Sequence, residues 1–192
     1  MNNFAALIPV KAFDSAKERL STVLESSGRA ELARTLATGV IEACSGLSVW
    51  VVCEDDLVES WARNLGVSVI RNPDAGLNEA VSYGFTSLKH KGFERVLISH
   101  GDLKQPSGLP SLFEMKGIVI VPDSKLDGTN VLVLPTDIEF TFSYGRDSYT
   151  KHLDLAERTG LPVSTVKDSK FSFDLDEPDD LDEFNVQDDS SV

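Results

Sequence analysis

Short apolar runs alternate with helical repeats along most of the chain, which is the pattern of an α/β fold. Continuous apolar runs over residues 4–10, 47–53 and 67–70 predict buried strands. Between these runs, apolar side chains at helical spacing predict one helix over 29–44 and another over 55–65. The first third of the chain therefore predicts a βαβαβ unit.

The clearest helical repeat covers residues 77–88, where apolar residues recur at i, i+3, i+4, i+7, i+8 and i+11. It leads through Gly92 into the apolar run 96–98, a predicted buried strand that is followed by Asp102. The remaining pattern predicts a short helix near 107–115, strands over 117–121, 130–134 and 161–166, and a helix over 147–160. Strands and helices thus continue to alternate.

The chain of 192 residues is long enough for one α/β domain, which we expect over 1–186, with an acidic tail over 187–192. Its 31 acidic and 18 basic residues give a net charge of −13. This balance argues against nucleic acid or an anionic membrane surface as a partner. The two cysteines lack zinc spacing, and no apolar run reaches the ~18 residues of a membrane span. We therefore expect a cytoplasmic protein.

Positive charge is concentrated directly after the first predicted strand, at Lys11, Lys17 and Arg19. Ligands of open α/β sheets bind beyond the carboxyl ends of the strands, so this loop is a candidate site for a phosphate chain. It contains no glycine, so it is neither a Walker loop nor a dinucleotide fingerprint. An ordinary solvated loop is the alternative.

Three carboxylates are candidate metal ligands. Asp102 follows a predicted strand, although an acid that only turns the chain is an equal alternative. Asp174 and Asp176 alternate around Leu175 at the end of a predicted short strand, so they share a face. Such a pair repels unless a cation lies between, which indicates a hard divalent ion such as Mg²⁺. The acidic residues within 179–183 are interpreted as a solvated surface.

A third candidate site combines a turn with a helix start. Asp127-Gly-Thr-Asn130 precedes a predicted strand and by itself indicates only turn chemistry. Ser148 lies at a helix start, where a hydroxyl and backbone N–H groups suit an anion, and His152 lies on the same face. Together they predict a small phosphate or carboxylate pocket.

These motifs resemble one known family in their order and spacing. They are Ile8-Pro-Val-Lys11, Ala16-Lys-Glu-Arg-Leu20, Gly76-Leu-Asn78, Asp102, Asp127-Gly-Thr-Asn130, Tyr144-Gly145, Ser148-Tyr149, His152 and Asp174-Leu-Asp-Glu-Pro-Asp-Asp-Leu181. The set is similar to the phospholactate and phosphoenolpyruvate guanylyltransferases of deazaflavin coenzyme biosynthesis. The similarity extends over residues 8–181.

The resemblance implies a nucleotide-diphospho-sugar-transferase-like, Rossmann-like single domain with a mixed, mainly parallel sheet flanked by helices. It implies transfer of GMP from GTP to 2-phospho-L-lactate, phosphoenolpyruvate or 3-phospho-D-glycerate, with release of pyrophosphate. Carried over residue by residue, the nucleotide side is Lys11, Lys17, Arg19 and Asn78, the acid side is Thr129, Gly145 and Ser148, and the Mg²⁺ ligands are Asp102, Asp174 and Asp176. Lys17 and Arg19 would stabilise the leaving pyrophosphate.

The sequence departs from the family pattern at two places. His100-Gly101 precedes Asp102 in place of a small pair, and Lys104-Gln105 separates Leu103 from Pro106. The family's Gly-Pro-Gly-Ser becomes Gly145-Arg-Asp-Ser148, so Arg146 is a candidate partner for a substrate carboxylate. The identity of the acid stays open, and His90 and His100 receive no role.

Two other functions remain as alternatives. One is a non-catalytic module that binds a nucleotide or phosphorylated metabolite. The other is a nucleotidyltransferase for a sugar phosphate or a molybdenum-cofactor precursor, which is disfavoured because the glycine-rich first loop of that group is missing. A homodimer also stays open, because an interface stripe and a core stripe look alike in one sequence.

Overall fold

The computed structural model describes residues 3–72, 76–167 and 169–181. Its strands are β1 (Phe4–Pro9), β2 (Ser48–Cys53), β3 (Ser68–Arg71), β4 (Arg95–Ser99), β5 (Ile118–Pro122), β6 (Thr129–Pro135) and β7 (Val163–Thr165). Its α-helices are α1 (Ser26–Ala43), α2 (Asp56–Asn64), α3 (Leu77–His90) and α4 (Ser148–Arg158). Its 3-10 helices are η1 (Phe13–Ser15), η2 (Glu18–Thr22), η3 (Leu109–Glu114) and η4 (Lys170–Ser172).

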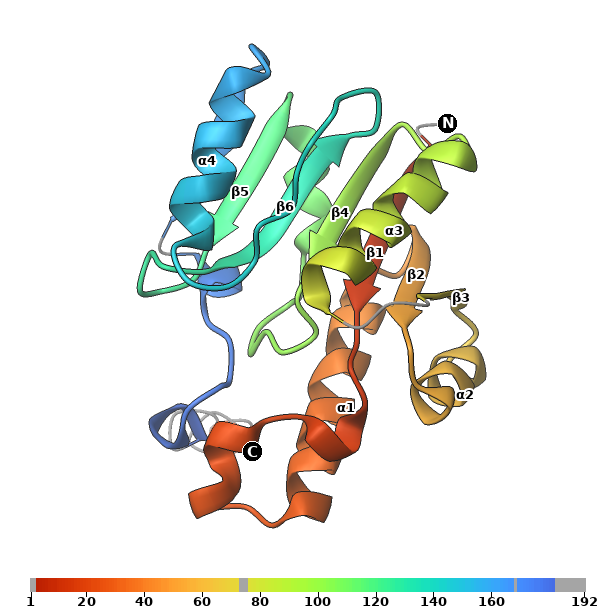
Figure 1. The fold of residues 1–192 in the computed structure, drawn as a ribbon, viewed down its shortest axis with the longest axis vertical. Helices are drawn as coiled ribbons and strands as arrows, with labels where there is room; N and C mark the ends of the chain where they lie inside the picture. The colour runs from red at the N-terminus through yellow and green to blue at the C-terminus, as the bar shows by residue number, and fades with distance from the viewer. Residues whose placement is uncertain (1–2, 73–75, 168, 182–192) are drawn as a thin grey trace.

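The described strands form one sheet in the order β3-β2-β1-β4-β6-β5-β7 (Figure 1). β6 runs antiparallel to both of its neighbours, and the other neighbouring strands are parallel. The predicted single-domain α/β fold with a mixed, mainly parallel sheet is therefore confirmed. The predicted tail over 187–192 lies outside the described residues.

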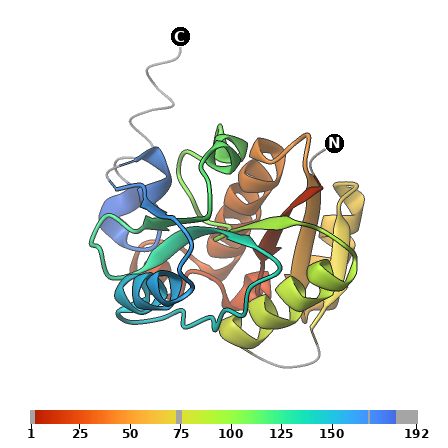
Figure 2. The ribbon, with the colours of Figure 1, turned by 90° about the horizontal axis from the view of Figure 1, so that it is seen from above.

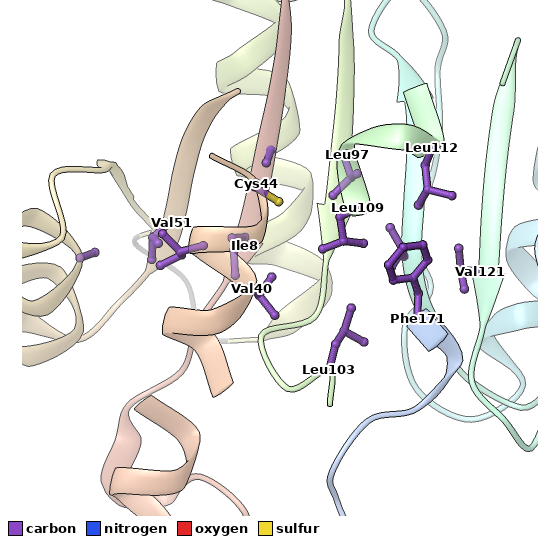
Figure 3. Packing of buried hydrophobic residues seen from close by; sticks show 14 of the residues in the cluster. Ile8, Val40, Cys44, Val51, Leu97, Leu103, Leu109, Leu112, Val121 and Phe171 are labelled. Atoms are coloured by element: carbon purple, nitrogen blue, oxygen red, sulfur yellow. The ribbon is translucent and has the colours of Figure 1, made fainter. Parts of the chain in front are cut away.

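Helices cover both faces of the sheet, as the view along the molecule shows (Figure 2). α1, α2 and η3 pack on one face, and α3 and α4 pack on the other. The alternation of β1 explains this arrangement, because Ala6 and Ile8 face α1 while Ala5 and Leu7 face α3. Ile8 and Leu97 lie with Val40 of α1 in the first of these two cores (Figure 3).

The direction of β6 decides what meets at the carboxyl edge of the sheet. Because β6 alone among the described strands runs the opposite way, its first residue, Thr129, lies at the edge where β1 and β4 end. The loop after β1, the residues after β4 and the start of α4 therefore border one side of the molecule. In Figure 1 this is the lower side, where the chain after β7 also descends beside η1 and η2.

Two predicted elements differ from the structure. The short helix predicted near 107–115 is the 3-10 helix η3. The short strand predicted to end at Asp174 and Asp176 is wrong, because η4 precedes these residues and Asp174 forms only an isolated antiparallel bridge with Leu103. A single bridge forms because the two segments cross briefly at the sheet edge, beyond the ends of the regular strands.

The described helices include none that is long and apolar enough to cross a lipid bilayer.

Candidate active site

A cavity of about 450 Å³ opens at the carboxyl edge of the sheet. It lies between the loop after β1 and the residues after β4, with α1 and the chain after β7 at its sides. Its charged and ionisable lining residues are Lys11, Lys17, Glu18, Arg19, His100, Asp102 and Asp176. The structure thus brings the three predicted cations together with two of the three predicted metal ligands.

Lys17 lies at the centre of this group. Its Nζ donates a hydrogen bond of 2.6 Å to Oδ2 of Asp102 and is 3.6 Å from Oδ1 of Asp176. The side chain is only 6% exposed, and the backbone adopts a left-handed conformation with φ of 56° at the start of η2. The ammonium therefore bridges two of the predicted metal ligands, where the sequence predicted a cation that faces phosphate.

Asp102 and Asp174 are brought together by backbone pairing. The N–H of Leu175 donates to the carbonyl of Asp102, and the N–H of Lys104 donates to the carbonyl of Phe173. Leu175 itself is buried against η2 and α1, and of the two acids that flank it, Asp176 lines the cavity while Asp174 lies beside Asp102. These contacts link residues about 70 positions apart, so no local pattern could predict them.

The pKa values of Asp102 and Asp174 are shifted in opposite directions. Burial raises the pKa of Asp102, but the charges of Lys17 and His100, together with hydrogen bonds from Lys17 and the backbone, outweigh burial and hold that pKa below its ordinary value. Burial, and then the negative charge of Asp102, raise the pKa of Asp174. One oxygen of Asp102, Oδ1, is buried and has no hydrogen-bond partner among the described residues. Asp102 therefore has one hydrogen-bond acceptor without a donor among the described residues, and its negative charge repels that of an ionised Asp174.

Arg19 and Asp180 organise the segment that carries Asp176. Arg19 donates to Oδ2 of Asp176 at 2.9 Å. Asp180 accepts the N–H groups of Asp176 and Glu177 and pairs with Lys104 at 3.2 Å. The interpretation of Asp180 as a solvated surface residue is therefore wrong. Its signal was Pro178 at the first position of a helical turn with an acid two residues later, a position from which a side chain can bond back to the N–H groups before the turn.

The described residues contain no ready-made cluster of three His, Cys, Asp or Glu side chains that could hold a metal ion. Asp176 instead contacts Lys17 and Arg19. Two of the three predicted Mg²⁺ ligands, Asp102 and Asp176, are thus engaged by cations of the protein.

Asn78, predicted on the nucleotide side, has a structural contact. Its amide oxygen accepts the N–H of Tyr144 at 2.6 Å, and its amide nitrogen donates to the carbonyl of Tyr144 at 3.3 Å. This two-point contact ties the start of α3 to the segment that precedes α4. Leu77, the preceding residue, lines the cavity.

The predicted acid-side hydroxyls lie together but face inward. Nδ1 of His152 is 3.0 Å from Oγ1 of Thr129, and Oγ of Ser148 is 3.4 Å from the same atom. Nε2 of His152 accepts the N–H of Ser143, which assigns the remaining proton to Nδ1. None of the three side chains is more than 1% exposed. Burial lowers the pKa of His152 to about 4, so the ring is neutral at pH 7.

The start of α4 is capped from within the chain. Asp127 accepts the N–H of Asp147 through its carboxylate and the N–H of Tyr149 through its carbonyl. Two backbone N–H groups at this helix start are thus engaged by Asp127. Gly145, the third predicted acid-side residue, is exposed and has a φ of 112°, a value that favours glycine.

Arg146 and His100, at the two places where the sequence departs from the family pattern, differ strongly in their surroundings. The side chain of Arg146 is 91% exposed and lies 3.9 Å from the carboxylate of Asp147. His100 lines the cavity, and its Nε2 is buried without a hydrogen-bond partner among the described residues. Sequence reasoning gave His100 no role, although its position between β4 and Asp102 was a usable signal.

One known protein family matches nearly the whole chain. The family described as "Guanylyl transferase CofC like" matches residues 4–191. The chain belongs to this family. It is 36% identical to a phosphoenolpyruvate guanylyltransferase of Rubrobacter xylanophilus over 92% of this chain and 90% of that protein. It is 28% identical to a 2-phospho-L-lactate guanylyltransferase of Methanocaldococcus jannaschii, over 94% of this chain and 81% of that protein.

Among solved structures, a putative nucleotide-diphospho-sugar transferase from Desulfovibrio desulfuricans has a TM-score of 0.83 and 18% identity. The match covers 100% of this chain and 90% of that one. At this identity the likeness describes the fold only. The resemblance to the CofC-like guanylyl transferase family and the nucleotide-diphospho-sugar-transferase-like fold are both confirmed.

Proposed function

We propose that the protein transfers GMP from GTP to a small phosphorylated carboxylic acid, as its relatives are named for doing. A phosphate oxygen of the acid attacks the α-phosphorus of GTP. The bond from that phosphorus to the bridging oxygen breaks, and pyrophosphate leaves. The reaction needs in-line placement and charge neutralisation more than it needs a protein nucleophile.

The observation that carries the proposal is the cavity at the carboxyl edge, where cations and carboxylates face one another within a guanylyl transferase family member. Lys11 and Arg19 line the cavity and are both exposed, the Arg19 side chain to 69%, so both can reach a triphosphate. Lys17 adds a positive charge from the buried side. These three residues would neutralise GTP and the leaving pyrophosphate.

We further propose that Asp102, Asp174 and Asp176 hold Mg²⁺. Two observations support this assignment. Oδ1 of Asp102 is buried and lacks a partner among the described residues, and the charge of Asp102 contributes to the raised pKa of Asp174. A hard cation, which prefers oxygen ligands, would give the unpartnered oxygen of Asp102 a partner and would offset the repulsion between the two carboxylates. When bound, Mg²⁺ supplies charge neutralisation between two polyanionic substrates.

Lys11 and Asn78 belong to the GTP side of this proposal, and Gly145 belongs to the acid side. Thr129 and Ser148 would act indirectly, since their hydroxyls are buried in the contact with His152. We place the reaction in the cytoplasm, because the two cysteines, at positions 44 and 53, are both unpaired thiols.

The test is pyrophosphate release by the purified protein with GTP and Mg²⁺. The panel contains 2-phospho-L-lactate, phosphoenolpyruvate, 3-phospho-D-glycerate and glucose 1-phosphate. We expect release with one of the three acids, reduced about 100-fold or more in Asp102→Asn and Asp174→Asn. Asp137→Asn, at an exposed position, is the matched control and should keep full activity.

Two other results would count against the proposal. Release with glucose 1-phosphate alone would assign the protein to the sugar-phosphate nucleotidyltransferases. A melting temperature that rises with GTP, without release for any acid, would indicate a binding module. Turnover that is unchanged by chelation of divalent ions would refute the Mg²⁺ assignment while leaving the transfer reaction intact.

A further inference from the structure

Buried polar atoms without partners gather around one histidine of the cavity. Nε2 of His100 is buried and unpartnered among the described residues, and so is the hydroxyl of the neighbouring Tyr144. The two ring centroids are 5.2 Å apart. Buried polar atoms are normally hydrogen-bonded, so an unpaired nitrogen on a histidine that lines the cavity is a candidate to gain a partner when a ligand binds.

The other polar groups on this side are already engaged. The hydroxyls of Thr129 and Ser148 contact each other and are almost fully buried. Arg146, the sequence-based candidate for a substrate carboxylate, is 91% exposed on the surface. Among the described residues named for the acid side, this leaves no buried side-chain donor toward the cavity, whereas His100 lines it.

His100 is held rigidly enough to act as a recognition group. The backbone N–H of His100 donates to the backbone carbonyl of Asn130 at 3.0 Å, which continues the pairing of β4 with β6. Its ring lies against Tyr144, which packs edge-on against His152 at 4.9 Å and is fixed through its backbone by Asn78. A preorganised donor loses little freedom when a ligand binds.

We propose that His100 is a specificity-determining residue, and that its Nε2–H donates a hydrogen bond to the carboxylate of the phosphorylated acid. This inference rests on the proposed guanylyl transfer and names the residue that distinguishes an acid from a plain phosphate ester. The ring of Tyr144 is the platform that orients the imidazole. A sugar phosphate, which carries no carboxylate, gains nothing from this contact.

The test compares His100→Leu with His100→Gln, which keeps a side-chain N–H donor, and with His90→Leu as a control at an exposed position. The KM values for GTP and for the accepted acid are measured for each variant. In His100→Leu we expect the KM for the acid to rise about 10- to 100-fold while the KM for GTP stays unchanged. His100→Gln should recover most of the loss, and His90→Leu should match the wild type.

A binding measurement makes the inference independent of turnover. Calorimetry with a GTP analogue that cannot be cleaved between the α- and β-phosphorus compares each acid with glycerol 3-phosphate, which lacks the carboxylate of 3-phospho-D-glycerate. Wild-type protein should prefer the acid, and His100→Leu should lose that preference.

Each outcome is decisive. Equal losses for the acid and for glycerol 3-phosphate, or a rise in the KM for GTP by the same factor, would overturn the assignment and indicate a structural role. Acid binding that depends on His100 in a protein without turnover would support the inference and refute the proposed reaction. Absence of acid binding in the wild type would overturn both.

Discussion

Replacing Lys17 by methionine removes the ammonium that bridges Asp102 and Asp176 while keeping an unbranched side chain of similar length. Exposed ion pairs contribute about 0.2–1 kcal/mol, and breaking a buried pair costs about 3–5 kcal/mol. Lys17 is 6% exposed and Asp102 is 24% exposed, so the pair lies close to the buried limit. We expect the free energy of unfolding to fall by about 3 kcal/mol at pH 7, measured by urea denaturation.

The pH dependence of this loss has a defined sign. The pKa of Asp102 is lower in the folded protein than in the unfolded chain, because Lys17 stabilises the carboxylate. Its contribution is therefore complete above the unfolded pKa of about 3.9 and is lost as the pH falls through the lower folded pKa. In Lys17→Met, burial without the ammonium raises the pKa of Asp102, so the difference between wild type and variant should be largest near neutral pH and shrink as the pH falls toward and below about pH 4.

A double-mutant cycle separates this pair from general effects of the substitution. Lys17→Met should cost much less when Asp102 is already asparagine, because the buried carboxylate is then gone. Lys125→Met is the matched control, since Lys125 pairs with Glu177 at 3.0 Å but is 68% exposed, and it should produce no measurable change. The reasoning fails if Lys17→Met is as stable as the wild type, or if its cost is the same in both backgrounds.

Two further predictions concern stability. The pKa of His152 is about 4 in the folded protein, below its value in the unfolded chain, so the free energy of unfolding decreases as the pH falls from about 6.5 to about 4. In urea titrations over that range, wild type should lose about 3 kcal/mol more than His152→Gln. Equal losses would contradict this prediction. A Cβ at Gly84 would lie 2.8 and 2.9 Å from two methyl carbons of the buried Leu7. Gly84→Ala should therefore lower the free energy of unfolding by about 1–2 kcal/mol, although alanine is a better helix former than glycine. The control Ser82→Ala, at an exposed position of α3, should cause no such loss. A stabilised Gly84→Ala variant would show that α3 shifts freely.

Elements with a long apolar pattern were predictable from the sequence. The repeat over 77–88 predicted α3 because its apolar residues fall on one helical face, and the run 96–98 predicted β4 because it is buried on both sides. The 3-10 helices η1 and η2 were missed, because they are too short to show a period.

The site was predictable as a set of residues and much less as a set of contacts. Position after a strand was enough to select Lys17 and Asp102, which belong to one cavity. That their side chains bond to each other depends on two segments 85 residues apart, and the inward direction of Thr129 depends on how α4 packs on β6. Such orientations follow from tertiary packing, which one sequence does not display.

The reversed direction of β6 also places the candidate contacts for the two substrates on different parts of the sheet. The candidate nucleotide contacts come from the loop after β1 and the start of α3, whereas the candidate acid contacts come from the start of β6 and from α4. His100, after β4, lies between the two halves, because it lines the cavity while its ring contacts Tyr144 and its backbone N–H bonds Asn130 at the start of β6. One half can therefore diversify while the other is kept, and relatives named for different acids are the outcome that such a modular sheet permits.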